Sequence, residues 1–315
     1  MIKVVNTKDM DYQDWLEWRH KGIGGSDAGA VCGLNPYRSA IDVYVDKTSK
    51  TVEAKEPNET MRLGNDLEEY VAKRWEEATG KKVRKNNFLM AHDDYPFMQA
   101  NIDREVVGEN AILECKTASP YSADKWADGG IPPHYVIQCL HYMAVTGAEK
   151  CYLACLIFQR GVEFREIERD EETINALIEM ESKFWNENVL KKQMPAPDGS
   201  KASGQALLDS YPYSNENIEA NLSEFKTQLD RYEELEQMLS AMKKEQDKIK
   251  QDIQQKMKTA EVGYCDNYKV TWKTSKPRVT IDTKKLQKEQ ADIFEQYKKV
   301  GNPTRRFTIK RFEEE

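Results

Sequence analysis

Residues 101–116 of this 315-residue chain, NIDREVVGENAILECK, contain Asp103, Glu114 and Lys116 at a spacing that suggests a site. Asp103 stands eleven residues before Glu114, and Lys116 follows Glu114 by two. Residues two apart on a strand point to the same face, and a preceding hairpin strand can bring Asp103 beside them. Two carboxylates that converge with a lysine are the groups that Mg²⁺-dependent phosphodiester hydrolysis requires, because carboxylate oxygens bind hard cations and the lysine acts on the attacking water.

The surroundings of this pattern decide how it is interpreted. A Glu-x-Lys pair on a solvated strand is common in a chain with 32% charged residues, and that alternative stays open. However, Ile112, Leu113 and Cys115 are apolar, which predicts a strand that is at least half buried. Charged groups beside a core need partners or a function, so the context favours a site.

Two predicted helices carry further polar candidates. Glu68 is a third carboxylate, on an amphipathic helix at about 60–79. Gln138 and Tyr142 share one face of a predicted helix at 133–146, where they could orient a water or a phosphate. The alternatives are an ordinary solvated glutamate and a polar patch on a buried helix.

The hydrophobic pattern of the first 195 residues predicts a mixed α/β domain. Strands are expected at 83–89, 97–107, 111–116, 151–158 and 162–167, the last two as a hairpin. Helices are expected at 12–20, 28–32, 60–79, 133–146 and 171–190. Ser26 and Asp27 are predicted to cap the second helix, and Glu181 interrupts the apolar stripe of the last one.

The distribution of charge and of helix-breaking residues divides the chain. The net charge of −7 sums an acidic part, with 25 basic and 34 acidic residues over 1–200, and a remainder with 22 and 20. Residues 196–216 are predicted to be a linker and 217–260 a long heptad-like helix, broken at Glu236 and Gln246. Residues 261–315 are predicted to form a basic strand-helix-strand module.

Composition excludes several protein classes. No segment approaches the roughly 18 apolar residues of a membrane span, and the first residues lack the apolar core of a signal peptide, so a cytoplasmic protein is expected. The six scattered cysteines are expected to be reduced thiols. Neither a zinc-hydrolase pattern nor a Walker loop is present, which argues against zinc and ATP.

Six blocks occur in the order found in one known family. They are Trp18 to Ala28 (WRHKGIGGSDA), Asn35-Pro36-Tyr37, Gly64 with Glu68, Asn101-Ile102-Asp103, Leu113 to Thr117 (LECKT), and Tyr135, Gln138, Tyr142 and Met143. Over about residues 12–190 the chain resembles the YqaJ-like viral recombinase family, phage exonucleases similar to lambda exonuclease within the PD-(D/E)xK superfamily. The resemblance implies a restriction-endonuclease-like α/β (α+β) core with a mixed central sheet flanked by helices. Its one departure is Ile102-Asp103 in place of Pro-Asp, which that branch tolerates.

The resemblance also implies roles for individual residues. Asp103, Glu114 and the Cys115 carbonyl would bind Mg²⁺, with Mn²⁺ expected to substitute, and Glu68 would help to hold a second ion. Lys116 would act on the attacking water, and Gln138 would position that water or the scissile phosphate.

DNA contacts follow from the same comparison. Arg19 and Ser26 match the positions that grip the terminal phosphate of a 5′ end, and Tyr135 matches an active-site tyrosine. Gly22, Gly24 and Gly25 would let the backbone approach a phosphate before a helix N-terminus near Ser26. A helix–loop–helix turn with an ordinary cap is the alternative for this segment.

The resulting functional hypothesis is an ATP-independent DNA exonuclease, bacterial or phage-encoded. It would degrade one strand of linear duplex DNA from the 5′ end for phage-type recombination. The resemblance further implies a homo-oligomer, such as a trimeric ring, and a phage single-strand annealing protein as partner. A structure-specific endonuclease and a non-catalytic DNA-binding or assembly protein are the alternatives.

Overall fold

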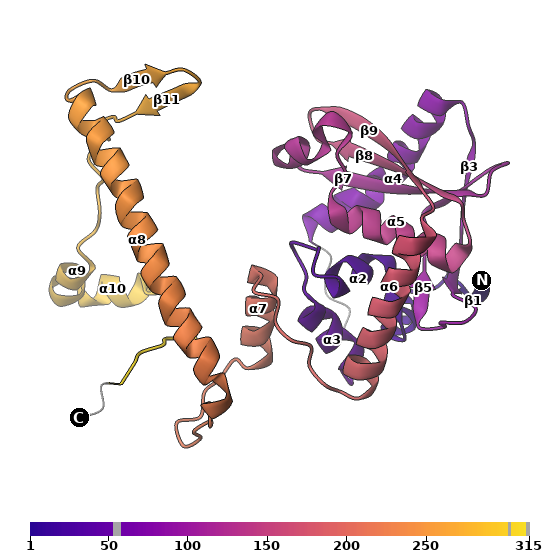
Figure 1. Ribbon diagram of the computed structural model, residues 1–315, viewed down its shortest axis with the longest axis horizontal. Helices are drawn as coiled ribbons and strands as arrows, with labels where there is room; N and C mark the ends of the chain where they lie inside the picture. Colours follow the sequence, from indigo (N-terminus) through magenta and orange to yellow (C-terminus); the bar gives the residue numbers. More distant parts are fainter. Residues whose placement is uncertain (53–57, 302–303, 313–315) are drawn as a thin grey trace. The chain divides into compact units, whose positions relative to one another are not determined.

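The computed structural model describes residues 1–52, 58–301 and 304–312. The chain forms two compact units, Met1–Pro212 and Tyr213–Glu315, which are treated separately below (Figure 1). The candidate residues all belong to the first unit.

The first unit is built on a five-stranded mixed sheet. Its strands, in spatial order, are β3 (Val83–Lys85), β6 (Arg104–Val106), β7 (Ala111–Ala118), β8 (Lys150–Ile157) and β9 (Gly161–Glu168). The central pair β7 and β8 is parallel, and the other pairs are antiparallel. The hairpin expected from 151–158 and 162–167 is therefore confirmed as β8 and β9.

A helix covers each face of this sheet. On one face, α4 (Glu59–Thr79) packs Val71 and Trp75 against Leu113, and on the other α5 (Pro133–Thr146) packs among residues that include Ile112. Because side chains alternate along a strand, Glu114 and Lys116 share the α5 face with Ile112. The expected mixed sheet flanked by helices is confirmed (Figure 1).

A second sheet stands beside the first and changes two strand predictions. Its order is β1 (Ile2–Asn6), β4 (Phe88–Ala91), β5 (Met98–Ala100) and β2 (Ile23–Gly24). The strands expected at 83–89 and 97–107 each divide between the two sheets, and the second divides at 101–103. There the Asn101 and Asp103 side chains accept hydrogen bonds from Trp15 Nε1 and the Cys115 amide, which replace ladder bonding and let the chain change sheets.

The remaining helices of the first unit surround these sheets. They are α1 (Tyr12–His20), α2 (Gly25–Val31), α3 (Ala40–Thr48), the 3₁₀ segment η1 (Pro120–Gly129), α6 (Glu171–Lys183), the π-helical η2 (Phe184–Leu190) and α7 (Lys201–Ser210). The helix expected at 171–190 is thus α6 continued by η2. The cap predicted at Ser26 and Asp27 is wrong by two to three residues: the N-cap of α2 is Gly24, and the Asp27 carboxylate accepts a hydrogen bond from the Gly24 amide.

The segment 196–216, predicted to be a linker, contains a packed helix. Ser203 and Ala206 of α7 are buried, and α7 lies against α3. The first unit therefore continues to Pro212 instead of ending at 195. Only Ser203 and Ala206 of α7 are buried, so its apolar periodicity is weak. The surrounding Pro, Gly and Ser residues therefore led to the prediction of a linker.

The second unit contains one long helix and a small C-terminal region. Its elements are the 3₁₀ turn η3 (Ser223–Phe225), α8 (Lys226–Met257), the hairpin β10 (Val262–Cys265) and β11 (Tyr268–Thr271), α9 (Thr283–Glu289) and α10 (Ala291–Tyr297). The helix α8 (Figure 1) is shorter than the expected 217–260. None of its residues is buried. The final strand of the expected strand-helix-strand module is not found: residues 304–312 form no strand, and two short helices follow the hairpin.

The structure also bears on the cysteines and on membrane-spanning segments. All six cysteines are free thiols, as expected. In the described part of the chain, no helix combines the length and apolarity that crossing a bilayer requires.

Candidate active site

Asp103 and Glu114 meet at the end of β6. Antiparallel pairing places Arg104 opposite Leu113, so Asp103, which immediately precedes β6, lies across from Glu114. The Asp103 Oδ2 atom accepts a hydrogen bond from the Cys115 amide at 2.8 Å. The convergence predicted for Asp103 and Glu114 is present, and the main chain of Cys115 lies at the same place.

Glu114 is the centre of a hydrogen-bonded cluster on the α5 face. Its Oε1 atom accepts from Lys116 Nζ at 2.6 Å and from Gln138 Nε2 at 2.7 Å. Gln138 Nε2 also lies 3.1 Å from the Tyr142 hydroxyl, so the i, i+4 pair predicted on one helical face makes direct contact. Glu114, Lys116, Gln138 and Tyr142 therefore form one connected group.

Burial and mutual repulsion raise the proton affinity of the carboxylates. Burial is the larger cause, and the nearby Glu114 carboxylate adds to it, so the pKa of Asp103 lies well above its usual range. Burial likewise raises the pKa of Glu114, although Lys116 opposes this. Burial opposes the charge of Lys116, but Glu114 and Asp103 outweigh it and raise its pKa, which keeps the side chain an ammonium.

The same group has the properties of an incomplete cation site. Glu114 Oε2 is buried without a hydrogen-bond partner among the described residues, while Asp103 and Glu114 share only one nearby ammonium. A divalent ion would satisfy the unpartnered oxygen and relieve the repulsion, so these donors fit a hard cation. In the described residues, no three His, Cys, Asp or Glu side chains form a complete ligand set.

Glu68, the expected third carboxylate, is held elsewhere. It belongs to α4, on the opposite face of the sheet, and its Oε1 atom pairs with Arg104. Arg104 is buried and also contacts Glu69 at 2.9 Å and the Asp103 carbonyl at 2.8 Å. Glu68 is near enough to raise the pKa of Asp103 and of Glu114, but it does not join them as a ligand set. Sequence reasoning missed Arg104, although its position directly after Asp103 was visible.

The predicted phosphate-binding pair is also assembled. Arg19, at the end of α1, donates from Nη2 to Ser26 Oγ at 2.8 Å, and its guanidinium lies over the Trp15 ring. A Cβ atom on Gly25 would come within 2.5 Å of Tyr142 Cε1, so only glycine lets this loop approach the ring so closely. Gly25 thus connects the Arg19–Ser26 pair to Tyr142 and hence to the Glu114 cluster.

Tyr135 lies on the lysine side of the cluster. Lys116 Nζ is 5.4 Å from the centre of its ring, and burial raises the pKa of its hydroxyl. The ring makes tilted contacts with those of Trp126 and His134. The Tyr135 ring therefore borders the Lys116 ammonium.

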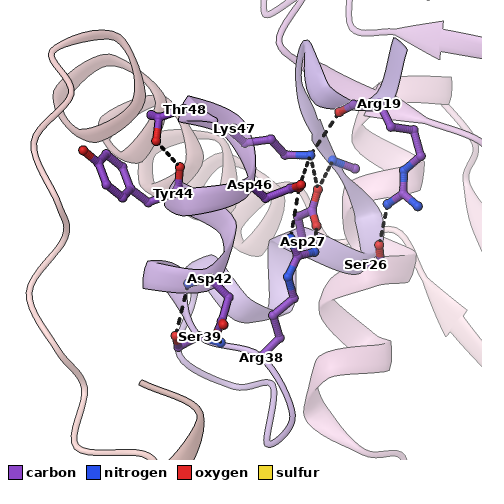
Figure 2. Close-up of polar contacts among 11 residues, drawn as sticks. Arg19, Ser26, Asp27, Arg38, Ser39, Asp42, Tyr44, Asp46, Lys47 and Thr48 are labelled. Atoms are coloured by element: carbon purple, nitrogen blue, oxygen red, sulfur yellow. Dashed lines mark hydrogen bonds and ion pairs between the residues drawn. The ribbon is translucent and has the colours of Figure 1, made fainter. Parts of the chain in front are cut away.

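A second polar cluster lies behind the Arg19–Ser26 pair, and sequence reasoning did not identify it. Figure 2 shows Arg38 and Lys47 converging on Asp27 beside Arg19 and Ser26. A cavity of about 670 Å³ adjoins the cluster and is lined by α1, α3 and α7. The only sequence signal was Asp27 itself, which appeared to be an ordinary helix cap.

Solved structures of exonucleases show a limited likeness to this chain. An alkaline exonuclease (LHK-Exo) from Laribacter hongkongensis is 22% identical, with a TM-score of 0.49 over 57% of this chain and 93% of that one. A phage-related exonuclease from Haemophilus somnus 129PT is 17% identical, with a TM-score of 0.40 over 56% of this chain and 99% of that one.

Sequence comparison gives a stronger relationship. The uncharacterized protein YqaJ of Bacillus subtilis (strain 168) is 38% identical over 312 residues, which cover 98% of this chain and 97% of that protein. The YqaJ-like viral recombinase domain matches residues 14–149, the range that contains Arg19, Glu68, Asp103, Glu114, Lys116 and Gln138. The chain belongs to the YqaJ-like viral recombinase family.

Proposed function

We propose that this protein is a nuclease of the lambda-exonuclease type that hydrolyses one strand of linear duplex DNA from its 5′ end. Membership of a viral recombinase family supports a nuclease, and the resemblance noted in the sequence supports the direction. The observation that carries the proposal is the buried cluster of Asp103, Glu114, Lys116 and Gln138, with an unpartnered carboxylate oxygen at its centre.

In this proposal, Asp103, Glu114 and the Cys115 carbonyl bind Mg²⁺ or Mn²⁺. When bound, the ion would supply Lewis-acid activation of the scissile phosphate and would lower the pKa of the attacking water. Glu68, whose Oε1 atom pairs with Arg104, would help to hold a second ion.

The side chains contribute orientation and charge. The Lys116 ammonium donates a hydrogen bond that holds the attacking water and balances charge on the phosphate. The Gln138 amide fixes Glu114 and, with Tyr142, borders the space where the phosphate would lie. Arg19 and Ser26 hold the terminal 5′ phosphate, which sets the position of the first phosphodiester relative to Asp103 and Glu114.

The decisive experiment uses linear duplex DNA labelled at either 5′ or 3′ ends, with Mg²⁺ or EDTA. We expect release of nucleotides from the 5′ end with Mg²⁺, none with EDTA, and a loss of at least about 100-fold in Lys116→Ala. Lys150→Ala is the matched control. Lys150 begins β8 opposite Ala111, at the end of β7 away from Lys116, and it pairs with Glu166 and Glu168.

Three outcomes would contradict parts of the proposal. Equal degradation in EDTA or by Lys116→Ala would exclude the metal-assisted mechanism. Comparable cleavage of closed circular DNA would instead indicate an endonuclease. DNA binding without any cleavage would favour the DNA-binding or assembly protein.

The partners remain proposals of the same kind. We expect a homo-oligomer, such as a trimeric ring, and an interaction with a single-strand annealing protein that coats the exposed strand. Measurement of mass in solution, with and without duplex DNA, tests the first expectation.

A further inference from the structure

We propose that Asp27 is a positioning residue for the Arg19–Ser26 pair, acting together with Lys47 and Arg38. The proposal rests on the proposed function, in which Arg19 and Ser26 hold a 5′-terminal phosphate. It assigns a task to a buried charge cluster that catalysis itself does not use (Figure 2).

Asp27 is completely buried and has three donors. Its Oδ2 atom accepts from the Gly24 amide at 3.2 Å and lies 3.0 Å from Lys47 Nζ, while Oδ1 pairs with Arg38. Burial disfavours its charge, but Arg38, Lys47 and Arg19 outweigh this and hold the pKa well below its usual range. The side chain is therefore a fixed anion inside the loop that carries Ser26.

Lys47 extends this connection to the helix that carries Arg19. Its side chain is 2% exposed, and its ammonium donates to the Arg19 carbonyl at 3.0 Å as well as contacting Asp27. The Asp27–Lys47 pair thus ties the end of α1 to the start of α2. Since Arg19 and Ser26 lie at these two points, the pair fixes the backbone on both sides of their hydrogen bond.

The charge balance of the cluster leaves the Arg19 guanidinium available to bind an anion. Arg38 and Lys47 balance Asp27 and Asp46, which lie within 3.1 Å of them. No carboxylate lies within ion-pairing distance of Arg19 in the described residues, where its hydrogen-bond partner is Ser26. The guanidinium consequently keeps N–H donors for an anion. Because Arg38 and Lys47 neutralise Asp27, its carboxylate does not compete with that anion for Arg19.

The surroundings of Gly24 show how closely the Arg19 guanidinium and the Asp27 carboxylate approach the loop between α1 and α2. A Cβ atom there would lie 3.2 Å from Arg19 Nη2 and 3.8 Å from Asp27 Oδ2. The loop therefore has space for the guanidinium and the carboxylate, with little to spare. Movement of Asp27 would be transmitted to Arg19 through Lys47, which contacts both the Asp27 carboxylate and the Arg19 carbonyl.

Binding of short duplexes in EDTA, where no cleavage occurs, provides the test. The readout is the ratio of the dissociation constants for 5′-hydroxyl and 5′-phosphoryl ends, which a general loss of stability would not change. We expect wild-type protein to favour the phosphorylated end by about tenfold, the size of one charge-assisted contact. Arg19→Ala and Asp27→Asn should both bring the ratio close to one.

Asp42→Asn is the matched control. Asp42 caps α3 through Ser39 and lines the same cavity, but it makes no hydrogen bond to Asp27 or Lys47. Its ratio should equal that of wild type. The double variant Asp27→Asn with Lys47→Met removes one charge of each sign, so it keeps the cluster balanced and guards against misfolding; its ratio should also be close to one.

The possible failures are distinguishable. If Arg19→Ala loses the preference while Asp27→Asn and the double variant keep it, Asp27 does not position Arg19. If wild type and Arg19→Ala show the same ratio, the 5′-phosphate role of Arg19 is wrong, and the inference about Asp27 falls with it.

Discussion

At the scale of single residues, Asp103 and Glu114 show a conflict between stability and the proposed chemistry. The buried Glu114 carboxylate and the half-buried Asp103 carboxylate lie close together, Lys116 pairs with Glu114, and the pKa of Asp103 is raised. A carboxyl group whose folded pKa exceeds its unfolded value of 3.8 lowers the stability of the fold progressively as the pH rises from 3.8 to the folded pKa, because the unfolded chain ionises first. Part of the folding free energy is thus given up to keep oxygen ligands together.

Asp103→Asn should therefore stabilise the protein in EDTA. Asparagine can still accept the Cys115 amide but carries no charge, so we expect a gain on the order of 1 kcal/mol at neutral pH. Mg²⁺ should raise the melting temperature of wild type and have much less effect on the variant. Thermal unfolding with EDTA and with Mg²⁺ measures both, and a lower melting temperature for Asp103→Asn in EDTA would contradict the argument.

At the scale of secondary-structure elements, one buried pair joins α5 to α6. His141 Nδ1 lies 2.8 Å from Glu181 Oε1, and His141 Nε2 lies 2.9 Å from the Gln99 carbonyl. A carbonyl can only accept, so Nε2 carries a proton, and a further proton lies between Nδ1 and the carboxylate. Both pKa values are raised, that of His141 by Glu181 against the effect of burial and that of Glu181 by burial.

This pair should make stability decrease with rising pH. Above the unfolded histidine value of about 6.5, the unfolded chain releases a proton that the folded pair retains until its own higher pKa is reached. The unfolding free energy should fall over that window by at most about 1.4 kcal/mol per pH unit. Denaturant unfolding at pH 6 to 9 measures the slope, and Glu181→Gln should lack it; an identical slope in the variant would show that other groups cause it.

The elements also show what sequence can and cannot predict. α1 and α5 have the expected ends, because apolar periodicity and the following glycine or turn define them locally. The shared face of Glu114 and Lys116 follows equally directly from the strand period. The division of the strand at 101–103 and the pairing of Glu181 with His141 depend on partners distant in sequence. From the sequence, Glu181 was therefore only an interruption of the apolar face of its helix.

The same limit applies to the candidate site. Gln138, Tyr142, Arg19 and Ser26 form the contacts that the motifs suggested. The pairing of Glu68 with Arg104 and the role of Lys47 could not be anticipated, because each depends on which helix covers which face of the sheet. Motifs identify the chemistry, whereas tertiary packing decides which carboxylates are free.

At the scale of the whole molecule, charge and burial differ between the two units. The residues proposed for catalysis lie within Met1–Pro212, whereas the basic segment 264–312 and α8 both belong to Tyr213–Glu315. Residues 264–312 carry 13 basic and 5 acidic side chains. Net charge for the full chain therefore says little about DNA binding, because opposite contributions are separated along the sequence.

Two truncations separate these contributions. A chain ending at Pro212 keeps α7 on α3 and should retain the melting temperature of the first unit and Mg²⁺-dependent release from 5′ ends. A chain ending at residue 200 lacks α7 and uncovers the surface against which Ser203 and Ala206 are buried, so we expect it to melt roughly 2–4 °C lower, as about 1 kcal/mol would cause in a domain of this size.

Both truncated chains should bind duplex DNA more weakly than the full chain at low salt, with a shallower dependence of affinity on salt, because the phosphate contacts of the basic segment are lost. Titrations at two or three salt concentrations and a measurement of mass in solution test this expectation. Unchanged affinity, salt dependence and mass after truncation at Pro212 would exclude a role for the second unit in DNA binding or assembly. Lost cleavage with retained folding would instead show that the second unit completes the active form.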